Sequence, residues 1–294
     1  MNVWENLRET FRRGDASIKL IYINVAVFIL LKFVAVLLML FNLSGFYLMY
    51  YLALPADLPQ LLHRAWTPIS YMFLHESFFH VFFNMLCLFW FGRMFLMYFS
   101  EKQLFGLYII GGLLAALFYI LAFNLFPYYE SVLSSALLLG ASGSVTAVIV
   151  ATAFRSPNAE MRLFLIGTVK LKYIAMALVL ISFFGITSDN SGGELAHLGG
   201  AFAGYLFASF ISKGRDITQG LNKIIDLLFT RFSRPKMKVS PKSKAYQKPM
   251  NDGDYNRNKA KRMEEIDRIL DKIKASGYES LSAEEKRKLF EMKR

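Results

Sequence analysis

Residues 195–212 read LAHLGGAFAGYLFASFIS, an apolar stretch that contains a histidine and many small residues. Its length suits a helix that crosses a bilayer, because a span needs about 20 mostly apolar residues. Gly200 and Gly204 form a G-x-x-x-G pattern, which allows a helix to approach a neighbouring membrane helix closely. An ionisable side chain such as His197 is costly inside lipid and marks a functional site. The stretch therefore predicts a closely packed membrane helix that carries a reactive group.

Five more segments have a similar length and character: about 20–41, 77–98, 104–126, 133–154 and 171–187. Each is expected to be helical, because in lipid the backbone polar groups must be satisfied within the segment. The 294 residues are 55% apolar, which exceeds the composition of an ordinary soluble domain. We therefore expect an all-α polytopic membrane protein with a bundle of six transmembrane helices over residues 18–212. Since Cys87 is the only cysteine, a disulfide scaffold and a thiolate metal site are excluded.

The distribution of Lys and Arg predicts the orientation of this bundle. Basic residues precede the first span, occupy the second and fourth loops, and fill the tail after the sixth span, whereas the other three loops hold only Arg64. Positive charge collects in cytoplasmic loops, so both termini are expected in the cytoplasm. Lys32 lies inside the first span, where it either snorkels to the interface or faces a polar interior.

The two ends of the chain differ from the spans. Residues 1–17 are expected to form an amphipathic segment, residues 213–256 an interfacial helix and a basic linker that contains prolines, and residues 257–294 a small cytoplasmic helical hairpin. Ser282 and Glu285 form a capping-box pattern at the start of its second helix. The net charge is +2 over residues 1–212 and +10 over residues 213–294. The basic tail is therefore expected to face anionic lipid rather than nucleic acid.

Three polar groups lie at a similar depth in three of the spans. Ser142 and His80 each precede the first basic residue of the next loop by 13 residues, and His197 precedes Lys213 by 16. At about 1.5 Å per residue, these groups lie roughly 20–24 Å above the inner ring of charge. Asn84 shares a helix face with His80, because four residues make about one turn. The four side chains are therefore expected to meet near the outer side of the membrane.

Their chemistry is that of hydrolysis by an activated serine. A neutral imidazole can take the proton of a serine hydroxyl near pH 7, so Ser142 is the expected nucleophile and His197 the base. No Asp or Glu lies within a predicted span to orient the imidazole, which favours a dyad over a triad. His80 and Asn84, with the Ser142 backbone N–H, are expected to stabilise the oxyanion. Close helix packing around this site is expected at four glycines, Gly140, Gly143, Gly200 and Gly204. No cofactor or metal is expected.

The ordered set of motifs resembles the rhomboid family of intramembrane serine proteases. The matching residues are Gly140-Ala141-Ser142-Gly143, His80-x-x-x-Asn84 and Ala196-His197-x-x-Gly200-x-x-x-Gly204. The resemblance implies a bundle of six helices in the bacterial plasma membrane that cleaves transmembrane protein substrates near the outer ends of their helices. It implies the same roles for Ser142, His197, His80 and Asn84. The oligomeric state does not follow from the sequence.

The chain departs from the family pattern at two positions. Thr67 follows Trp66 where many members have Trp-Arg, and Thr146 replaces an aromatic residue that often supports the base. The second difference leaves open which group orients His197. Two other functions are considered: a catalytically inactive relative that binds transmembrane helices, and a small transporter. The transporter would need paired broken helices in an internal repeat, which the sequence lacks.

Overall fold

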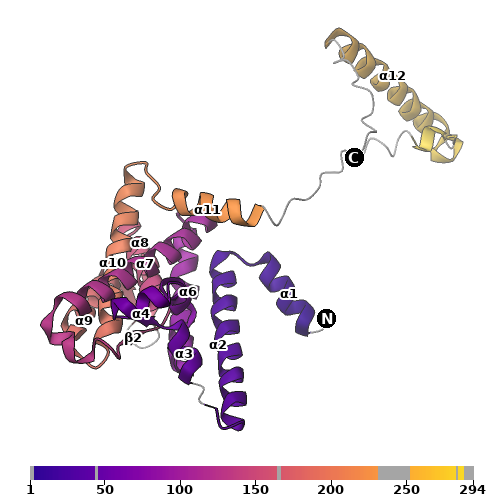
Figure 1. Ribbon diagram of the computed structural model, residues 1–294. Helices are drawn as coiled ribbons and strands as arrows, with labels where there is room; N and C mark the ends of the chain where they lie inside the picture. Colours follow the sequence, from indigo (N-terminus) through magenta and orange to yellow (C-terminus); the bar gives the residue numbers. More distant parts are fainter. Residues whose placement is uncertain (1–2, 44–45, 164–166, 231–251, 283, 288–294) are drawn as a thin grey trace. The chain divides into compact units, whose positions relative to one another are not determined.

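The computed structural model describes residues 3–43, 46–163, 167–230, 252–282 and 284–287 (Figure 1). The chain divides into two compact units, residues 1–233 and residues 234–294. The predicted linker prolines Pro235, Pro241 and Pro249 lie outside the described residues. Both units are mostly helical.

All six apolar segments contain a helix, but the helices differ in length. Within the described residues, four are long and apolar enough to cross a membrane: α2 (Ala16–Leu40), α6 (Phe78–Leu96), α7 (Glu101–Leu125) and α10 (Ser191–Ser212). Two apolar helices are shorter, α8 (Ser142–Arg155) and α9 (Leu171–Phe184), and the 3-10 helix η3 (Gly185–Thr187) extends α9. A multi-pass membrane protein follows from these lengths.

The prediction of a helix over 133–154 was wrong for its first part. Residues 133–141 are not helical, and β2 (Leu137–Leu138) pairs antiparallel with β1 (Leu54–Pro55). Gly140 has a φ of +126°, a backbone conformation that only glycine adopts readily, and its N–H donates to the Tyr71 carbonyl at 2.9 Å. The glycine therefore holds an extended segment in front of α8 and sets the position at which the helix begins.

The fold is mostly helical, and a second short hairpin is present, in which β3 (Glu160–Leu163) pairs antiparallel with β4 (Gly167–Lys170) between α8 and α9. The loop between α2 and α6 also contains ordered elements. Arg64 is buried there, and its guanidinium donates to the Tyr50 carbonyl and to Gln60 Oε1. The elements of this loop, besides β1, are α3 (Phe46–Leu52), α4 (Leu58–His63), α5 (Thr67–Ser70) and η1 (Tyr71–Phe73).

Helices α7, α8 and α10 pack so closely that their backbones touch. A Cβ added at Gly200 would lie 2.1 Å from the Gly143 carbonyl oxygen, and one at Gly204 would lie 2.4 Å from that of Ala147. The matched spacing of these pairs means that α8 and α10 run parallel. On the other side of α8, a Cβ at Gly111 would lie 2.6 Å from the Ala147 Cβ. We call the contact between α8 and α10 at these residues the glycine seam.

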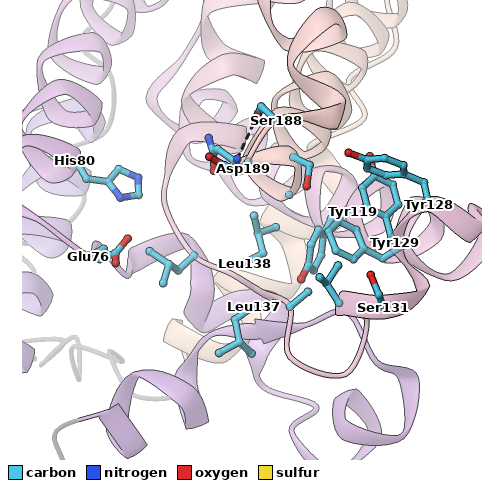
Figure 2. A pocket seen from close by; sticks show the side chains of 18 residues that line it. Glu76, His80, Tyr119, Tyr128, Tyr129, Ser131, Leu137, Leu138, Ser188 and Asp189 are labelled. Carbon is cyan, nitrogen blue, oxygen red and sulfur yellow. Dashed lines mark hydrogen bonds between the residues drawn. The ribbon is translucent and has the colours of Figure 1, made fainter.

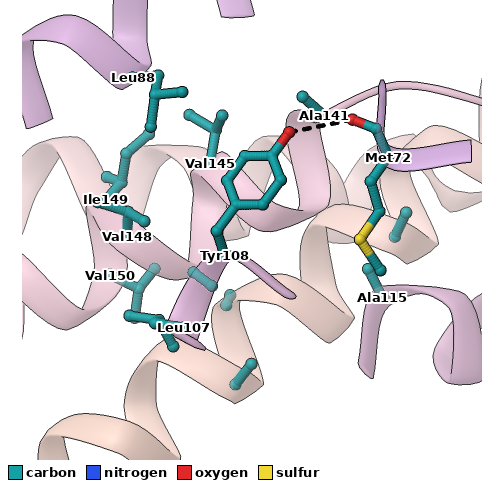
Figure 3. Packing of buried hydrophobic residues seen from close by; sticks show 14 of the residues in the cluster. Met72, Leu88, Leu107, Tyr108, Ala115, Ala141, Val145, Val148, Ile149 and Val150 are labelled. Atoms are coloured by element: carbon teal, nitrogen blue, oxygen red, sulfur yellow. Dashed lines mark hydrogen bonds between the residues drawn. The ribbon is translucent and has the colours of Figure 1, made fainter. Parts of the chain in front are cut away.

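The core beside the glycine seam is apolar with a few satisfied polar groups. In Figure 3, Tyr108 of α7 lies among Val145, Ile149 and Leu88, and its hydroxyl donates to the Met72 carbonyl at 3.1 Å. The same hydroxyl accepts a hydrogen bond from Asn24 Nδ2 of α2 at 3.1 Å. These bonds connect α2 and η1 to the packed helices.

Amphipathic and short helices complete the chain: α1 (Val3–Arg13), η2 (Pro127–Val132), α11 (Gln219–Thr230), α12 (Asp252–Ser276) and η4 (Tyr278–Ser280). In the first unit, Lys102 of α7 forms an ion pair with Asp226 of α11 at 2.6 Å. In the second unit the predicted capping box is present: Glu285 N–H donates to Ser282 Oγ, and Ser282 N–H donates to Glu285 Oε2. Residues 284–287 of the predicted second hairpin helix are helical, and residues 288–294 lie outside the described residues.

Candidate active site

Ser142 is the first residue of α8 and is partly exposed. The residue before it, Ala141, provides no side chain to cap the helix, and the Val145 N–H is bonded to the Ala141 carbonyl. The first N–H groups of a helix have no partner within it and carry partial positive charge. The Ser142 hydroxyl therefore lies at a helix end suited to binding an oxyanion.

His197 lies in the second turn of α10, and the side chains around its ring were not anticipated from the sequence. Its Nδ1 is 3.2 Å from Ser182 Oγ of α9 and 3.3 Å from Glu194 Oε2. Glu194 was excluded from the predicted span because that span began at residue 195, whereas α10 begins at Ser191. The i, i+3 spacing of Glu194 and His197 was the available signal, whereas the sequence offered none for Ser182.

His80 and Ser142 approach each other across Gly140. A Cβ added at Gly140 would lie 2.9 Å from His80 Nε2 and 3.8 Å from Ser142 Oγ. Asn84 is buried one turn further along α6, and its Nδ2 donates to the His80 carbonyl at 2.9 Å. The two residues thus lie along one side of α6 as predicted. One N–H of the Asn84 amide is already used in a hydrogen bond to the backbone of its own helix.

The glycine seam brings the segments of Ser142 and His197 together. A Cβ at Gly143 would lie 3.2 Å from the carbonyl oxygen of Ala196, so the neighbours of the two residues are in contact. Gly143, Gly200 and Gly204 thus lie at close approaches of α8 and α10, whereas Gly140 differs from them in its positive φ angle. Within the described part of the chain, no hydrogen bond joins the Ser142 hydroxyl to the His197 ring. Catalytic hydrogen bonds are often long in the absence of substrate.

His75 supports the His80 ring from outside the helix. The two rings meet edge to face with their centroids 5.0 Å apart. His75 is 2% exposed, and neither of its ring nitrogens has a hydrogen-bond partner among the described residues. Burial, with a smaller contribution from His80, lowers the pKa of His75 to about 4. His75 is therefore neutral at pH 7.

A cavity of about 830 Å³ opens beside these groups. In Figure 2, Glu76 and His80 lie on one side of it and three tyrosines, Tyr119, Tyr128 and Tyr129, lie on the other. Leu138 and Leu139 of the extended segment before Gly140 also line it, whereas Ser142 and His197 do not. The cavity thus reaches the site on the His80 side and is large enough for water and a peptide segment.

Ser144 and Lys32 are two further polar residues within the apolar helices. Ser144 is buried, and its hydroxyl lies 2.7 Å from the position of a Cβ at Gly112, on a different face from Ser142. Lys32 is exposed, and its Nζ donates at 2.6 Å to the carbonyl of Glu76, which lies just before α6. Among the residues described, no group of three His, Cys, Asp or Glu side chains is placed to hold a metal ion.

Comparison with known families gives two matches. The Rhomboid domain model matches residues 62–214, which is more than half of the chain. A family of unknown function, DUF6576, matches residues 251–292, which include α12 and η4. No curated protein matches the chain. The first match covers every residue of the candidate site.

Proposed function

The chain belongs to the rhomboid family, and on this premise we propose that it is an intramembrane serine protease that hydrolyses peptide bonds of transmembrane substrates. The observation that carries this proposal is the glycine seam. It places the start of α8, with Ser142, against the turn of α10 that holds His197. A nucleophile and a base delivered by two rigid helices are the elements of serine hydrolysis.

In the proposed reaction, Ser142 Oγ attacks the carbonyl carbon of the substrate peptide bond while His197 Nε2 takes the hydroxyl proton. The tetrahedral intermediate then expels the amine, which receives that proton from the imidazolium, and leaves an acyl-enzyme. Water, deprotonated by His197, releases the acid product and regenerates Ser142. The position of His197 Nδ1 toward Ser182 and Glu194 supports this assignment, because it leaves Nε2 for the serine.

The oxyanion would be stabilised by N–H groups already in place. The Ser142 backbone N–H at the start of α8 is the first donor, and His80 Nε2 near Gly140 is the second. Asn84 is a third, through the hydrogen of Nδ2 that the His80 carbonyl does not accept. Loss of one such donor typically costs about 2.7–4 kcal/mol in transition-state stabilisation.

The substrate is proposed to be a transmembrane protein whose helix unwinds near the outer end, since a helical peptide bond is shielded and already hydrogen-bonded. The cavity of about 830 Å³ supports this because it offers room for a peptide segment and water beside His80. We further propose a bacterial inner-membrane location with both termini in the cytoplasm and the site toward the outer side, as the distribution of basic residues indicates.

One observation favours a second candidate, an inactive relative that binds transmembrane helices. This is the missing hydrogen bond between Ser142 and His197 within the described residues. The two candidates make opposite predictions for a purified, reconstituted protein with a model transmembrane substrate. A protease cleaves it, and Ser142→Ala and His197→Ala each abolish cleavage while Ser144→Ala does not. An inactive binder gives no product with any of the four proteins.

A further inference from the structure

We propose that Glu194 and Ser182 are positioning residues that hold the His197 ring for catalysis, so that the site works as a supported dyad. The inference rests on the proposed protease function. It answers a question left by the sequence, namely what orients the base when Thr146 stands in place of an aromatic residue. In the described residues, the polar contacts of His197 Nδ1 come from these two side chains.

The two contacts come from different elements and converge on one nitrogen. Glu194 lies one turn before His197 on α10, and its Oε2 is 3.3 Å from Nδ1. Ser182 is almost wholly buried on α9, and its Oγ is 3.2 Å from the same atom. A ring held from its own helix and from a neighbouring helix cannot rotate without breaking both contacts.

The partners also determine which ring nitrogen carries the proton. An ionised carboxylate only accepts hydrogen bonds, so Glu194 requires a hydrogen on Nδ1. A neutral imidazole with its hydrogen on Nδ1 has a lone pair on Nε2, which is the form that can accept the Ser142 proton. The carboxylate would also stabilise the imidazolium that forms during the reaction.

Gly185 gives Glu194 the room to reach this position. A Cβ added at Gly185 would lie 2.8 Å from the Glu194 Cγ and 3.1 Å from its Cδ. The backbone of Gly185 has φ −83° and ψ −3°, a conformation that any residue adopts. An alanine there would therefore act on the Glu194 side chain rather than on the backbone.

The competing explanation is that Glu194 only stabilises the start of α10, where an acidic residue interacts favourably with the helix dipole. That role would change stability but not the rate of the chemical step. The two explanations can be separated by measuring kcat and KM, the rate at which a fluorophosphonate labels Ser142, and the Tm in detergent.

The experiment compares reconstituted wild type with Glu194→Gln, Glu194→Asp, Ser182→Ala, Gly185→Ala and Ser142→Ala. Glu130→Gln is the matched control, because Glu130 is an exposed carboxylate of η2 outside the site. We expect Glu194→Gln to lower kcat by about 10- to 100-fold, less than the about 10⁴-fold seen when a buried triad aspartate is replaced. KM and Tm should change little, and the labelling rate should fall in parallel with kcat.

The other variants test the same positioning role through their effects on kcat. Glu194→Asp should recover part of the lost kcat because it keeps the charge, and Ser182→Ala and Gly185→Ala should each lower kcat less than Glu194→Gln. Wild-type kcat in Glu194→Gln, or a loss confined to KM or Tm, would overturn the positioning role; if this variant does not fold, Gly185→Ala and Ser182→Ala decide the question. Cleavage that survives in Ser142→Ala would instead refute the protease mechanism itself.

Discussion

The glycine seam and α2 are both apolar and both belong to the first unit, yet they are packed in opposite ways. α2 is the more hydrophobic helix, but only 6% of its most apolar stretch is buried inside the protein, and Ile29, Leu30 and Phe33 are each 60% exposed. α10 is less hydrophobic, and half of its most apolar stretch is buried inside the protein. Its contact with α8 is made by glycine rather than by bulky side chains.

The difference shows that hydrophobicity locates a membrane helix but does not say how it packs. Lipid tails are as apolar as leucine, so a bulky side chain gains little by leaving lipid for another helix. Small residues instead let two backbones approach, which is how α8 and α10 bring Ser142 and His197 into neighbouring positions. The glycine seam therefore positions the candidate site, and α2 is attached mainly through its first half, which includes Asn24.

Breaking the glycine seam should have the largest effect. In Gly200→Ala the new Cβ would lie 2.1 Å from the Gly143 carbonyl oxygen, and neither backbone can move without separating α8 from α10. We expect more than a 100-fold loss of proteolysis and about 3 kcal/mol of destabilisation, at the upper end of overpacking effects. Proteolysis assays and thermal unfolding in detergent measure both. Wild-type activity in this variant would show that the seam does not position the site.

A smaller effect on stability is expected when the pH is lowered, because His75, the buried histidine beside His80, then becomes protonated. The pKa of His75 in the folded state, about 4, lies below the usual value of 6.5, so the unfolded state binds more protons as pH falls. Stability should be complete above pH 6.5 and decrease through pH 4, with a loss of about 2 kcal/mol between pH 7.5 and pH 5. His75→Gln should remove this loss, whereas His63→Gln, at an exposed histidine, should retain it. An equal pH dependence in both variants would contradict the assignment to His75.

The attachment of α2 can be weakened without touching the glycine seam. Tyr108→Phe removes the hydroxyl that bonds to the Met72 carbonyl and to Asn24. Thermal unfolding should show a loss of about 1 kcal/mol, the typical value of a buried hydrogen bond, with the candidate site otherwise intact. Unchanged stability would mean that these bonds do not hold α2 to the bundle.

The smallest effect is expected on the exposed face of α2. Phe33→Leu exchanges one apolar side chain for another on a surface that the protein does not cover, so stability should change by less than about 0.5 kcal/mol. Activity should equal that of wild type in the proteolysis assay. A loss comparable to that of Gly200→Ala would mean that α2 makes a contact of its own that the isolated chain does not contain.

Much of this fold could be predicted from the sequence, for physical reasons. A long apolar segment has few alternatives to a helix in lipid, and the helices formed in all six segments. The start of α8 could not be predicted from hydrophobicity, because residues 133–141 are largely apolar but not helical. Their conformation depends on pairing with the loop that contains β1 and on the φ angle of Gly140. Both are tertiary constraints.

The residues of the candidate site also differ in whether the sequence alone could point to them. His80, Asn84, Ser142 and His197 are proposed from residue type, spacing and depth, which are properties of single helices. Ser182 was missed because its contact with His197 joins α9 to α10, and no local pattern marks such a pair. Glu194 was missed because the predicted helix began at residue 195, four residues after the start of α10 at Ser191. The sequence thus pointed to the proposed reacting groups but not to the side chains that contact His197.

The most direct test of the central claim is covalent labelling of the reconstituted protein with a fluorophosphonate, followed by mass-spectrometric identification of the modified residue. If His197 activates Ser142, wild type and Ser144→Ala should be modified at Ser142 alone, and His197→Ala should lose the modification. Labelling at another residue, or labelling of Ser142 at an unchanged rate in His197→Ala, would contradict the account.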